Sequence, residues 1–285
     1  MTYVQREGQS PIDLHELGVR TKDFIVAAPS YEHTTESIEG MDGVVVLGST
    51  LSPRTIRALF KFASDDWIDF GRIRDDIFSL FDGKQSFYLI DKRQPEKRWK
   101  VKTNGQYEIP QEGLFGDFEV NFIAFNGYAE SIGTSTMAST FEHLQDLPVT
   151  YTDYQDIYAT KFKIYNPGKP IDPRNINHYL KISYKGNSEN LRIKNITTGD
   201  EWAYNGSSNV GDEIVLEGIR STKNNLSIFR DTNKRLITLD HGWNEFEISG
   251  APDAREYAVQ ANLPRKRIPV EQKKKPITFE FKFMF

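Results

Sequence analysis

Apolar and polar residues alternate along several segments of the first half of the chain. Between residues 55 and 62, apolar side chains occupy every second position, namely Ile56, Ala58, Phe60 and Phe62. A period of two gives a strand one apolar face, which predicts a half-buried strand. A helix through residues 56–60 is the alternative that the pattern leaves open.

The spacing changes to three or four residues immediately afterwards. The apolar positions there are Trp67, Phe70, Ile73, Ile77 and Phe81. This stripe predicts a helix within residues 65–81. Ser64 is a suitable N-cap, Asp65 and Asp66 suit the positive first turn, and Gly83 provides a stop signal.

The remaining apolar runs of residues 1–127 are typical of strands. They lie at 43–48, 86–91, 98–104 and 117–125, and a charged connection at 92–97 joins the second to the third. We therefore predict an α+β first domain of mainly β structure, a β-sandwich-like fold with one packed helix and a hairpin.

The second half has short strand-like runs and frequent turn signals. Residues 128–160 are rich in small and polar residues and predict a linker with one short helix. Residues 161–250 predict an antiparallel β-sandwich with no helical period. The expected strands lie at 161–165, 179–184, 191–195, 213–216, 226–230 and 245–248.

The chain ends with a basic arm and a strongly alternating strand. Residues 251–276 are rich in proline and lysine, which favours an extended, exposed arm. Residues 277–285 (ITFEFKFMF) place five apolar side chains on one face, so this strand needs a partner. It can close the second sandwich or return to the first domain. The prolines of residues 251–276 stiffen that segment and favour pairing of the terminal strand with the first domain.

Composition excludes several kinds of chemistry. The 285 residues are 38% hydrophobic and 27% charged, and the formal net charge is −4. No overall positive charge is available for nucleic acid or an anionic membrane. The chain has no cysteine, which excludes disulfides, thiolate metal sites and cysteine nucleophiles. Without a signal peptide or a long apolar run, we expect a soluble protein made in a reducing cytoplasm.

Motifs for catalysis, cofactors or metals are absent from the sequence. The best phosphate-loop candidate has Asp212 where a lysine is needed, and the segment 133–137 lacks a glycine for a nucleophile elbow. The five histidines have no metal-ligand spacing. The acidic pairs 65–66 and 75–76 suit a helix terminus and a solvated face. We predict no catalytic residue, cofactor or metal, and a solvated role for the lysines and arginines of 265–275.

Aromatic residues of the second domain leave one binding hypothesis. Trp202, Tyr204 and Trp243, together with Phe229, have the side chains that stack on sugar rings. Aromatic residues in a sandwich usually belong to its core. A carbohydrate-binding module that contributes to host cell-wall adhesion is therefore the alternative function.

Ordered segments along nearly the whole chain resemble the distal tail proteins (Dit) of long-tailed phages that infect Gram-positive bacteria. In the first domain these are PSY at 29–31, IEGMDG at 38–43, RTIR at 54–57, IFSLF at 77–81, KRWKV at 97–101 and FEVNF at 118–122. In the second they are YNPG at 165–168, IDPR at 171–174, KNITTG at 194–199, GWNEF at 242–246 and FEFKF at 279–283.

The resemblance implies a structural virion protein without enzymatic activity. It implies a homohexameric ring at the tail tip around the DNA channel, between the tail-tube protein and the tail-associated or receptor-binding proteins. The second domain is then galectin-like or carbohydrate-module-like and projects outward. The ring half would contain the helix and the hairpin, whose interface candidates are Trp67, Phe70, Ile77, Arg98, Trp99 and Lys100.

Overall fold

The computed structural model describes residues 2–142, 144, 146–157, 159–251 and 277–285. The chain divides into two compact units, residues 1–130 and residues 131–285. Both units are built mainly from antiparallel strands, which confirms the predicted mainly β fold class. The basic segment 252–276 lies outside the described residues.

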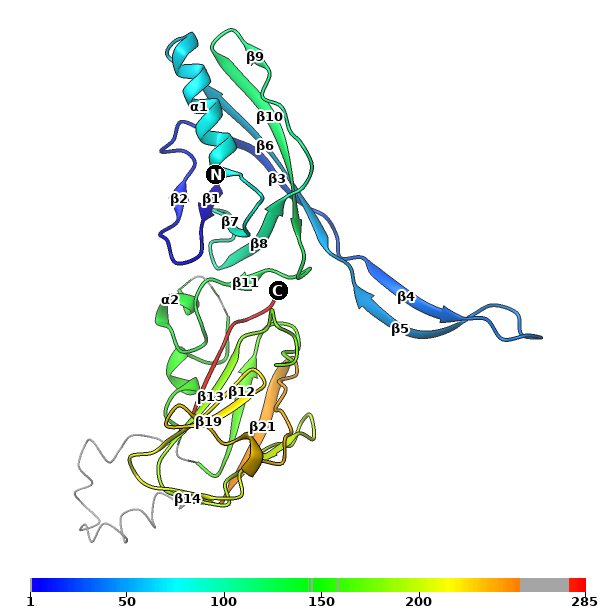
Figure 1. Ribbon diagram of the computed structural model, residues 1–285, viewed down its shortest axis with the longest axis vertical. Coiled ribbons are helices and arrows are strands. Elements are labelled where there is room, and N and C mark those ends of the chain that lie inside the picture. Colours follow the sequence, from blue (N-terminus) through cyan, green and yellow to red (C-terminus); the bar gives the residue numbers. More distant parts are fainter. Residues whose placement is uncertain (1, 143, 145, 158, 252–276) are drawn as a thin grey trace. The chain divides into compact units, whose positions relative to one another are not determined.

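The first unit contains one large antiparallel sheet (Figure 1). Its strands are β1 (Thr2–Gln5), β2 (Ile12–Asp13), β3 (Arg20–Val26), β6 (Arg54–Ala63), β7 (Phe87–Asp91), β8 (Lys97–Thr103), β9 (Gln111–Glu112) and β10 (Phe115–Ala124). The order is β2-β1-β7-β8-β10-β6-β3, with β9 beside β10. The strand predicted from the alternation at 55–62 is confirmed as β6, and β10 pairs with β6 along its whole length. β11 (Glu130–Ser131) spans the division between the units.

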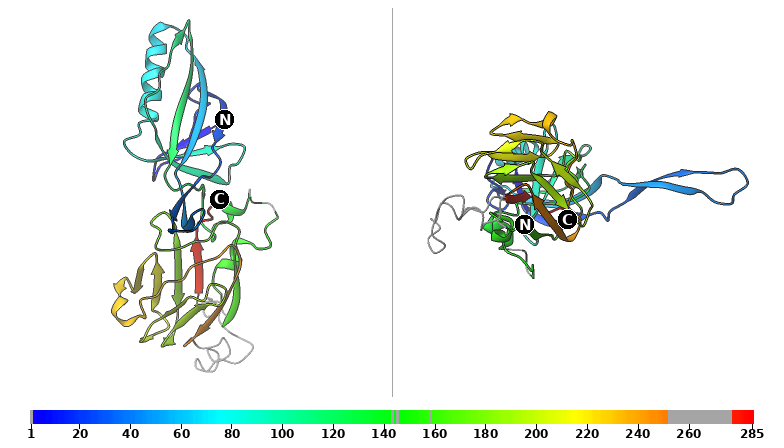
Figure 2. Two further views of the ribbon diagram at one scale, coloured as in Figure 1. Left: turned by 90° about the vertical axis from the view of Figure 1, so that its right-hand side faces the viewer. Right: turned by 90° about the horizontal axis from the view of Figure 1, so that it is seen from below.

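Helix α1 (Trp67–Leu80) runs alongside β10 and β6 in Figure 2. Its N-cap is Asp66, whose carboxylate accepts hydrogen bonds from the backbone N–H groups of Ile68 (2.8 Å) and Asp69 (2.7 Å). The expected cap, Ser64, is wrong, because its hydroxyl instead donates to the carbonyl of Leu114. The helix ends at Leu80, before the predicted stop at Gly83.

Aromatic side chains form the core between α1 and the sheet. The ring of Phe81 lies 5.3 Å from those of Phe60 and Phe122, measured between centroids. Phe70 packs in the same way on Phe62, at 5.1 Å. These residues come from the predicted alternating and helical positions, so the hydrophobic pattern identified this core correctly.

The second unit is a sandwich of two antiparallel sheets. One sheet has the order β12-β21-β15-β16, with β12 (Lys161–Asn166), β15 (Arg192–Asn195), β16 (Glu201–Ala203) and β21 (Gly242–Ser249). The other has the order β20-β19-β18-β13-β22, with β13 (Leu180–Lys185), β18 (Glu213–Glu217), β19 (Arg220–Lys223), β20 (Leu226–Ser227) and β22 (Ile277–Phe281). Smaller elements are β14 (Ser188–Glu189), β17 (Ser207–Ser208), α2 (Ala138–Phe141), η1 (Tyr151–Tyr154) and η2 (Phe229–Asp231).

The C-terminal strand belongs to the second unit. β22 pairs with β13 from Ile277↔Tyr184 to Phe281↔Leu180. Phe279 lies between the two sheets, 4.7 Å from Phe246 between ring centroids. The expectation that residues 277–285 complete the first domain is therefore wrong. Alternation predicts that a strand buries one face, but it does not identify the strand beside it.

The segment expected to be a linker covers the other edge of β22. The backbone N–H of Ser135 donates to the carbonyl of Phe281 (2.8 Å), and that of Ile157 donates to the carbonyl of Ile277 (2.7 Å). The Ser135 hydroxyl also donates to the carbonyl of Phe279 (2.9 Å). Both edges of this apolar strand are thus hydrogen-bonded, which removes the aggregation hazard of a free edge.

Candidate assembly surfaces

A two-stranded arm projects from the sheet of the first unit (Figures 1 and 2). It consists of β4 (Tyr31–Glu36), β5 (Val45–Leu51) and the connecting residues 37–44, and among the strands that the structure describes β4 pairs only with β5. Every residue of β4 is exposed. The arm's exposed large apolar side chains are Tyr31, Ile38, Met41, Val44, Val46 and Leu47. An isolated hairpin of this kind has no core, and its apolar surface marks a candidate interface.

The arm is acidic. Residues 31–51 contain four carboxylates and no lysine or arginine. The carboxylates belong to Glu32, Glu36, Glu39 and Asp42. None of them lies within 4.0 Å of a cationic nitrogen of the described residues. The arm therefore presents negative charge interleaved with apolar side chains.

Arg54 fixes the base of the arm. Its Nε and Nη2 donate to the carbonyl of Ala27 at 3.0 and 2.8 Å, and its guanidinium lies 4.8 Å from the ring centroid of Trp99. The backbone N–H of Ser52 donates to the carbonyl of Ser30 at 2.9 Å. The arm thus leaves the unit at the beginning of β6.

A cavity of about 660 Å³ lies near the opposite end of β6. Its lining residues are His15, Gly18, Arg20, Lys61, Phe62, Ala63, Glu112, Phe115, Gly116 and Asp117. We call this cavity the groove. Lys22 forms an ion pair with Asp117 at 2.6 Å, whereas no carboxylate of the described residues lies within 4.0 Å of Arg20 or Lys61. The groove therefore combines aromatic side chains with two unpaired cationic groups and with the carboxylates of Glu112 and Asp117.

Large apolar side chains are exposed beside the groove. Trp67 and Ile68, at the start of α1, are 69% and 70% exposed, and Phe115 is 64% exposed. The backbone N–H and the hydroxyl of Ser64 both donate to the carbonyl of Leu114, which holds the helix start beside the β9–β10 turn. This end of the unit is a second candidate interface.

The six predicted ring-interface residues fall into three groups. Trp67 and Lys100 are exposed. Phe70, Ile77 and Trp99 are buried in the core of the unit, so they support the fold instead of offering a surface. Arg98 pairs with Glu130 and is largely enclosed.

Arg98 belongs to a buried cluster of the first unit. Its Nη2 lies 2.6 Å from Oε1 of Glu130, and its guanidinium lies 3.9 Å from the ring centroid of Tyr88. Burial, reinforced by the Glu130 charge, raises the pKa of Tyr88 above its ordinary value. These groups lie on β7, β8 and β11, so the ion pair ties the end of the unit to its sheet.

The predicted sugar-stacking residues are also divided. Phe229, named with the other three, is 45% exposed and lies in η2. Trp202 is 1% exposed and donates from Nε1 to the Ser221 hydroxyl at 3.1 Å, and Tyr204 is 7% exposed. Both are core residues. Trp243 is 44% exposed, and its ring centroid lies 5.0 Å from that of Tyr165 on the neighbouring strand. The accessible aromatic pair is therefore Trp243 and Tyr165, and the sequence analysis did not identify Tyr165.

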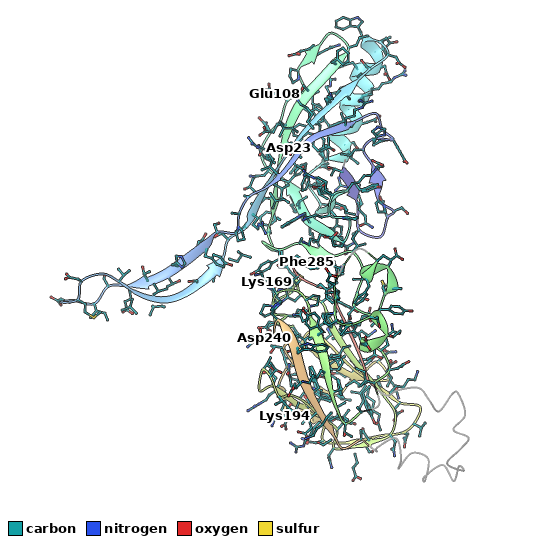
Figure 3. The ribbon with its side chains drawn as sticks, turned by 180° about the vertical axis from the view of Figure 1, so that it is seen from behind. Asp23, Glu108, Lys169, Lys194, Asp240 and Phe285 are labelled. Carbon is teal, nitrogen blue, oxygen red and sulfur yellow. The ribbon has the colours of Figure 1, made fainter. Side chains whose placement is uncertain are left out.

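Three fully buried asparagines underlie this aromatic pair. Asn166, Asn195 and Asn244 come from the segments YNPG, KNITTG and GWNEF. Asn195 Nδ2 donates to Asn244 Oδ1 at 3.1 Å, and Asn166 and Asn244 both donate to the carbonyl of Asp240. Asp240 and Lys169, in the loops that this network holds, are labelled in Figure 3. These segments are therefore structural.

His178 is a partly buried histidine of the second unit. Its Nδ1 accepts a hydrogen bond from the backbone N–H of Asp172 at 3.0 Å. A backbone N–H can only donate, so Nδ1 must be unprotonated. Burial lowers the pKa of His178.

Among the described residues, no three or more histidine, aspartate or glutamate side chains are grouped so as to hold a metal ion. The same residues contain no helix long and apolar enough to cross a membrane. The basic cluster at 265–275, predicted to be a solvated arm, lies outside the described residues.

Comparison with known protein families assigns the first unit. Residues 9–124 match the family described as the phage tail protein RIFT-related domain. This match agrees with the resemblance of the sequence to phage tail proteins. No curated protein matches the sequence.

The fold of the whole chain is similar to that of Dit (gp 19.1) of phage SPP1. The superposition has a TM-score of 0.67 at 12% identity and covers 100% of this chain and 99% of that one. The solved SPP1 protein is described as a paradigm of the hub adsorption apparatus in phages that infect Gram-positive bacteria. Chains of the phage p2 baseplate in its activated conformation, with strontium or calcium, align with a TM-score of 0.47 at 10% identity, over 99% of this chain and 97% of theirs.

Proposed function

We propose that this protein is a distal tail protein that forms a homohexameric ring in the tip of a phage tail. The ring joins the tail-tube protein on one side to tail-associated or receptor-binding proteins on the other, and DNA passes through its centre. The protein is made in the cytoplasm of the host bacterium and works in the virion. The observation that carries the proposal is the tail-protein domain at 9–124 within a chain that has the SPP1 Dit fold throughout.

The surfaces of the first unit support an assembly role. A closed ring of identical copies uses heterologous contacts, so each copy needs two different surfaces that fit one another. The acidic apolar arm and the end of the unit around Trp67 and Phe115 are two such exposed surfaces. The number six rests on the resemblance to the Dit family.

Light scattering and negative-stain imaging of the purified full chain test this function. Six copies of 32.8 kDa give a particle of about 200 kDa. We expect such a particle with sixfold symmetry at high protein concentration, in equilibrium with monomer at low concentration. A stable dimer or trimer as the largest species at high concentration would contradict the proposal.

The pair of exposed Trp243 and partly exposed Tyr165 supports a second function, adhesion to a cell-wall carbohydrate. Trp and Tyr rings stack on sugar faces, and the ion pair between Lys163 and Glu245 (2.6 Å) lies next to them on the same two strands. The test is a glycan array with the full chain. Binding that Trp243→Ala abolishes and Trp67→Ala preserves supports adhesion, and no binding at millimolar sugar refutes it.

A further inference from the structure

The arm cannot reach the groove of its own chain. It leaves the unit at the beginning of β6, next to Arg54, whereas the groove is lined by Lys61, Phe62 and Ala63 near the end of that strand. Lys61 lies seven positions after Arg54 along the strand, which corresponds to a distance of about 23 Å. Figures 1 and 2 show the arm extending away from the sheet. An arm that occupies this groove must therefore come from another chain.

The groove also offers an unpaired strand edge. β3 pairs with β6 only as far as Arg20↔Lys61, while β10 continues on the other side of β6 to Phe115↔Ala63. Beyond Lys61, no described strand lies on the β3 side of β6. Such an edge accepts an additional strand through backbone hydrogen bonds, and neighbouring side chains give specificity. The arm has two exposed strands of the kind that this mode requires.

The charges of the two surfaces are complementary. The arm carries Glu36, Glu39 and Asp42 around its turn and no lysine or arginine. The groove presents Arg20 and Lys61, neither of which has a carboxylate of the described residues within 4.0 Å. It also contains Glu112 and Asp117, and Lys22 pairs with Asp117, so the cations around the groove outnumber the carboxylates by one. Exposed apolar side chains accompany the charges on both sides, with Ile38 and Met41 on the arm and Phe115 at the groove. A volume of about 660 Å³ suits several side chains of a peptide segment.

We propose that the turn of the arm, residues 36–45, docks in the groove of a second copy of this chain. Ile38 and Met41 contact the aromatic lining, while Glu36, Glu39 and Asp42 face Arg20 and Lys61. The inference rests on the proposed ring, because it names the contact that joins one copy to the next. Each copy gives its arm to one neighbour and receives the arm of the other.

A charge exchange tests this contact in the full chain. The arm variant carries Glu39→Lys and Asp42→Lys, and the groove variant carries Arg20→Glu and Lys61→Glu. Each variant alone places like charges opposite each other, so we expect assembly to require at least about tenfold more protein. In an equimolar mixture, alternating copies pair every reversed arm with a reversed groove and every natural arm with a natural groove. A ring with an even number of copies closes in this way, so the mixture should assemble like the natural protein.

The matched control carries Glu108→Lys and Glu142→Lys, which change the net charge by the same amount as the arm variant, at exposed positions outside both surfaces. Figure 3 labels Glu108. We expect this control to assemble like the natural protein, and circular dichroism should show natural melting for all variants. Natural assembly of both single-surface variants, or loss of assembly in the mixture, would overturn the proposed contact while the ring itself still stands.

Disulfide trapping tests the contact without requiring a stable ring. The chain has no cysteine, so Met41→Cys in one preparation and Ala63→Cys in another supply the only thiols. Mild oxidation of the mixture should give a covalent dimer, and replacing Ala63→Cys with Ser249→Cys should give none. A trapped dimer without any ring supports the contact and contradicts the hexamer. The opposite result is a ring that forms although Met41→Cys and Ala63→Cys give no more dimer than the control. That result would refute the contact and leave the ring intact.

Discussion

Asn195 donates its side-chain amide to Oδ1 of Asn244 at 3.1 Å, and both side chains are fully buried in the second unit. Asn244 Oδ1 also accepts from the backbone N–H of Asp240 at 2.8 Å. Its own Nδ2 donates to the carbonyls of Asp240 and Gly242. One side chain therefore satisfies polar groups on a strand and on the preceding loop.

Asn244→Ala should lower the free energy of unfolding of the second unit by about 3 kcal/mol, because it leaves several buried polar groups without partners. Urea denaturation followed by tryptophan fluorescence measures this change. Asn177→Ala, at an exposed position, is the control and should have little effect. Equal stability of the two variants would show that water replaces the network.

Arg98→Met should destabilise the first unit by about 3–5 kcal/mol, because it leaves the Glu130 carboxylate in a largely enclosed site without its cation. The measurement is the thermal unfolding transition of the full chain. The double variant Arg98→Met with Glu130→Leu should recover much of the loss. A double variant as unstable as the single one would indicate that packing of Arg98 on Tyr88 matters more than charge.

Phe279→Ala should cost about 3–5 kcal/mol in the second unit, since it removes a ring that is buried between the two sheets. Trp243→Ala removes a larger but exposed side chain and should cost far less. Hydrogen exchange should locate the effect: residues of β13 lose protection and those of β6 keep it. Loss of protection in β6 instead would mean that the terminal strand supports the first unit.

Acidification should weaken the second unit through His178. Its pKa in the folded protein is lowered by burial, so the neutral form stabilises the fold. This contribution is complete above the unfolded pKa of about 6.5 and is lost as the pH falls through the lower folded value. His178→Asn retains an acceptor for the Asp172 N–H and cannot titrate. The pH dependence of its melting temperature between 7 and 5 should be flatter than that of the natural protein.

The protein should not bind duplex DNA at micromolar concentration. A net charge of −4 per chain gives about −24 for six copies, and binding through phosphates requires cations that release counterions. An electrophoretic mobility assay at 50 and 200 mM salt measures this. Salt-sensitive binding would contradict the expectation that DNA passes through the ring without being retained.

The spacing of apolar residues predicted strands and helices correctly where the element has one apolar face that lies against the core. The alternation at 55–62 and 117–125 gave β6 and β10, and the three-to-four spacing gave α1. Trp67 fits that spacing but is exposed, because it begins the helix beyond the sheet. The spacing therefore predicts which residues share the apolar face of a helix, but not how far along the helix that face is covered.

The candidate surfaces were predicted less well. The run at 43–48 is typical of a strand whether or not anything covers it, so its exposure on the arm was not apparent. The absence of lysine and arginine throughout 31–51 was the available signal. Likewise, Trp202 and Trp243 both occur in strand-like segments, and only the sandwich shows that the first points inward and the second outward.

By itself, the sequence determined that the protein is mainly β, which residues of each strand share a face, and its resemblance to the Dit family. These properties depend on the spacing of neighbouring residues and on the order of short segments. Only the tertiary structure decided that β22 pairs with β13, that Ser135 and Ile157 form hydrogen bonds to its other edge, and that no other strand of the described residues pairs with the arm. Strand pairing joins residues far apart in sequence, and many apolar edges would accept the same alternating strand, so the choice depends on how the whole sandwich closes.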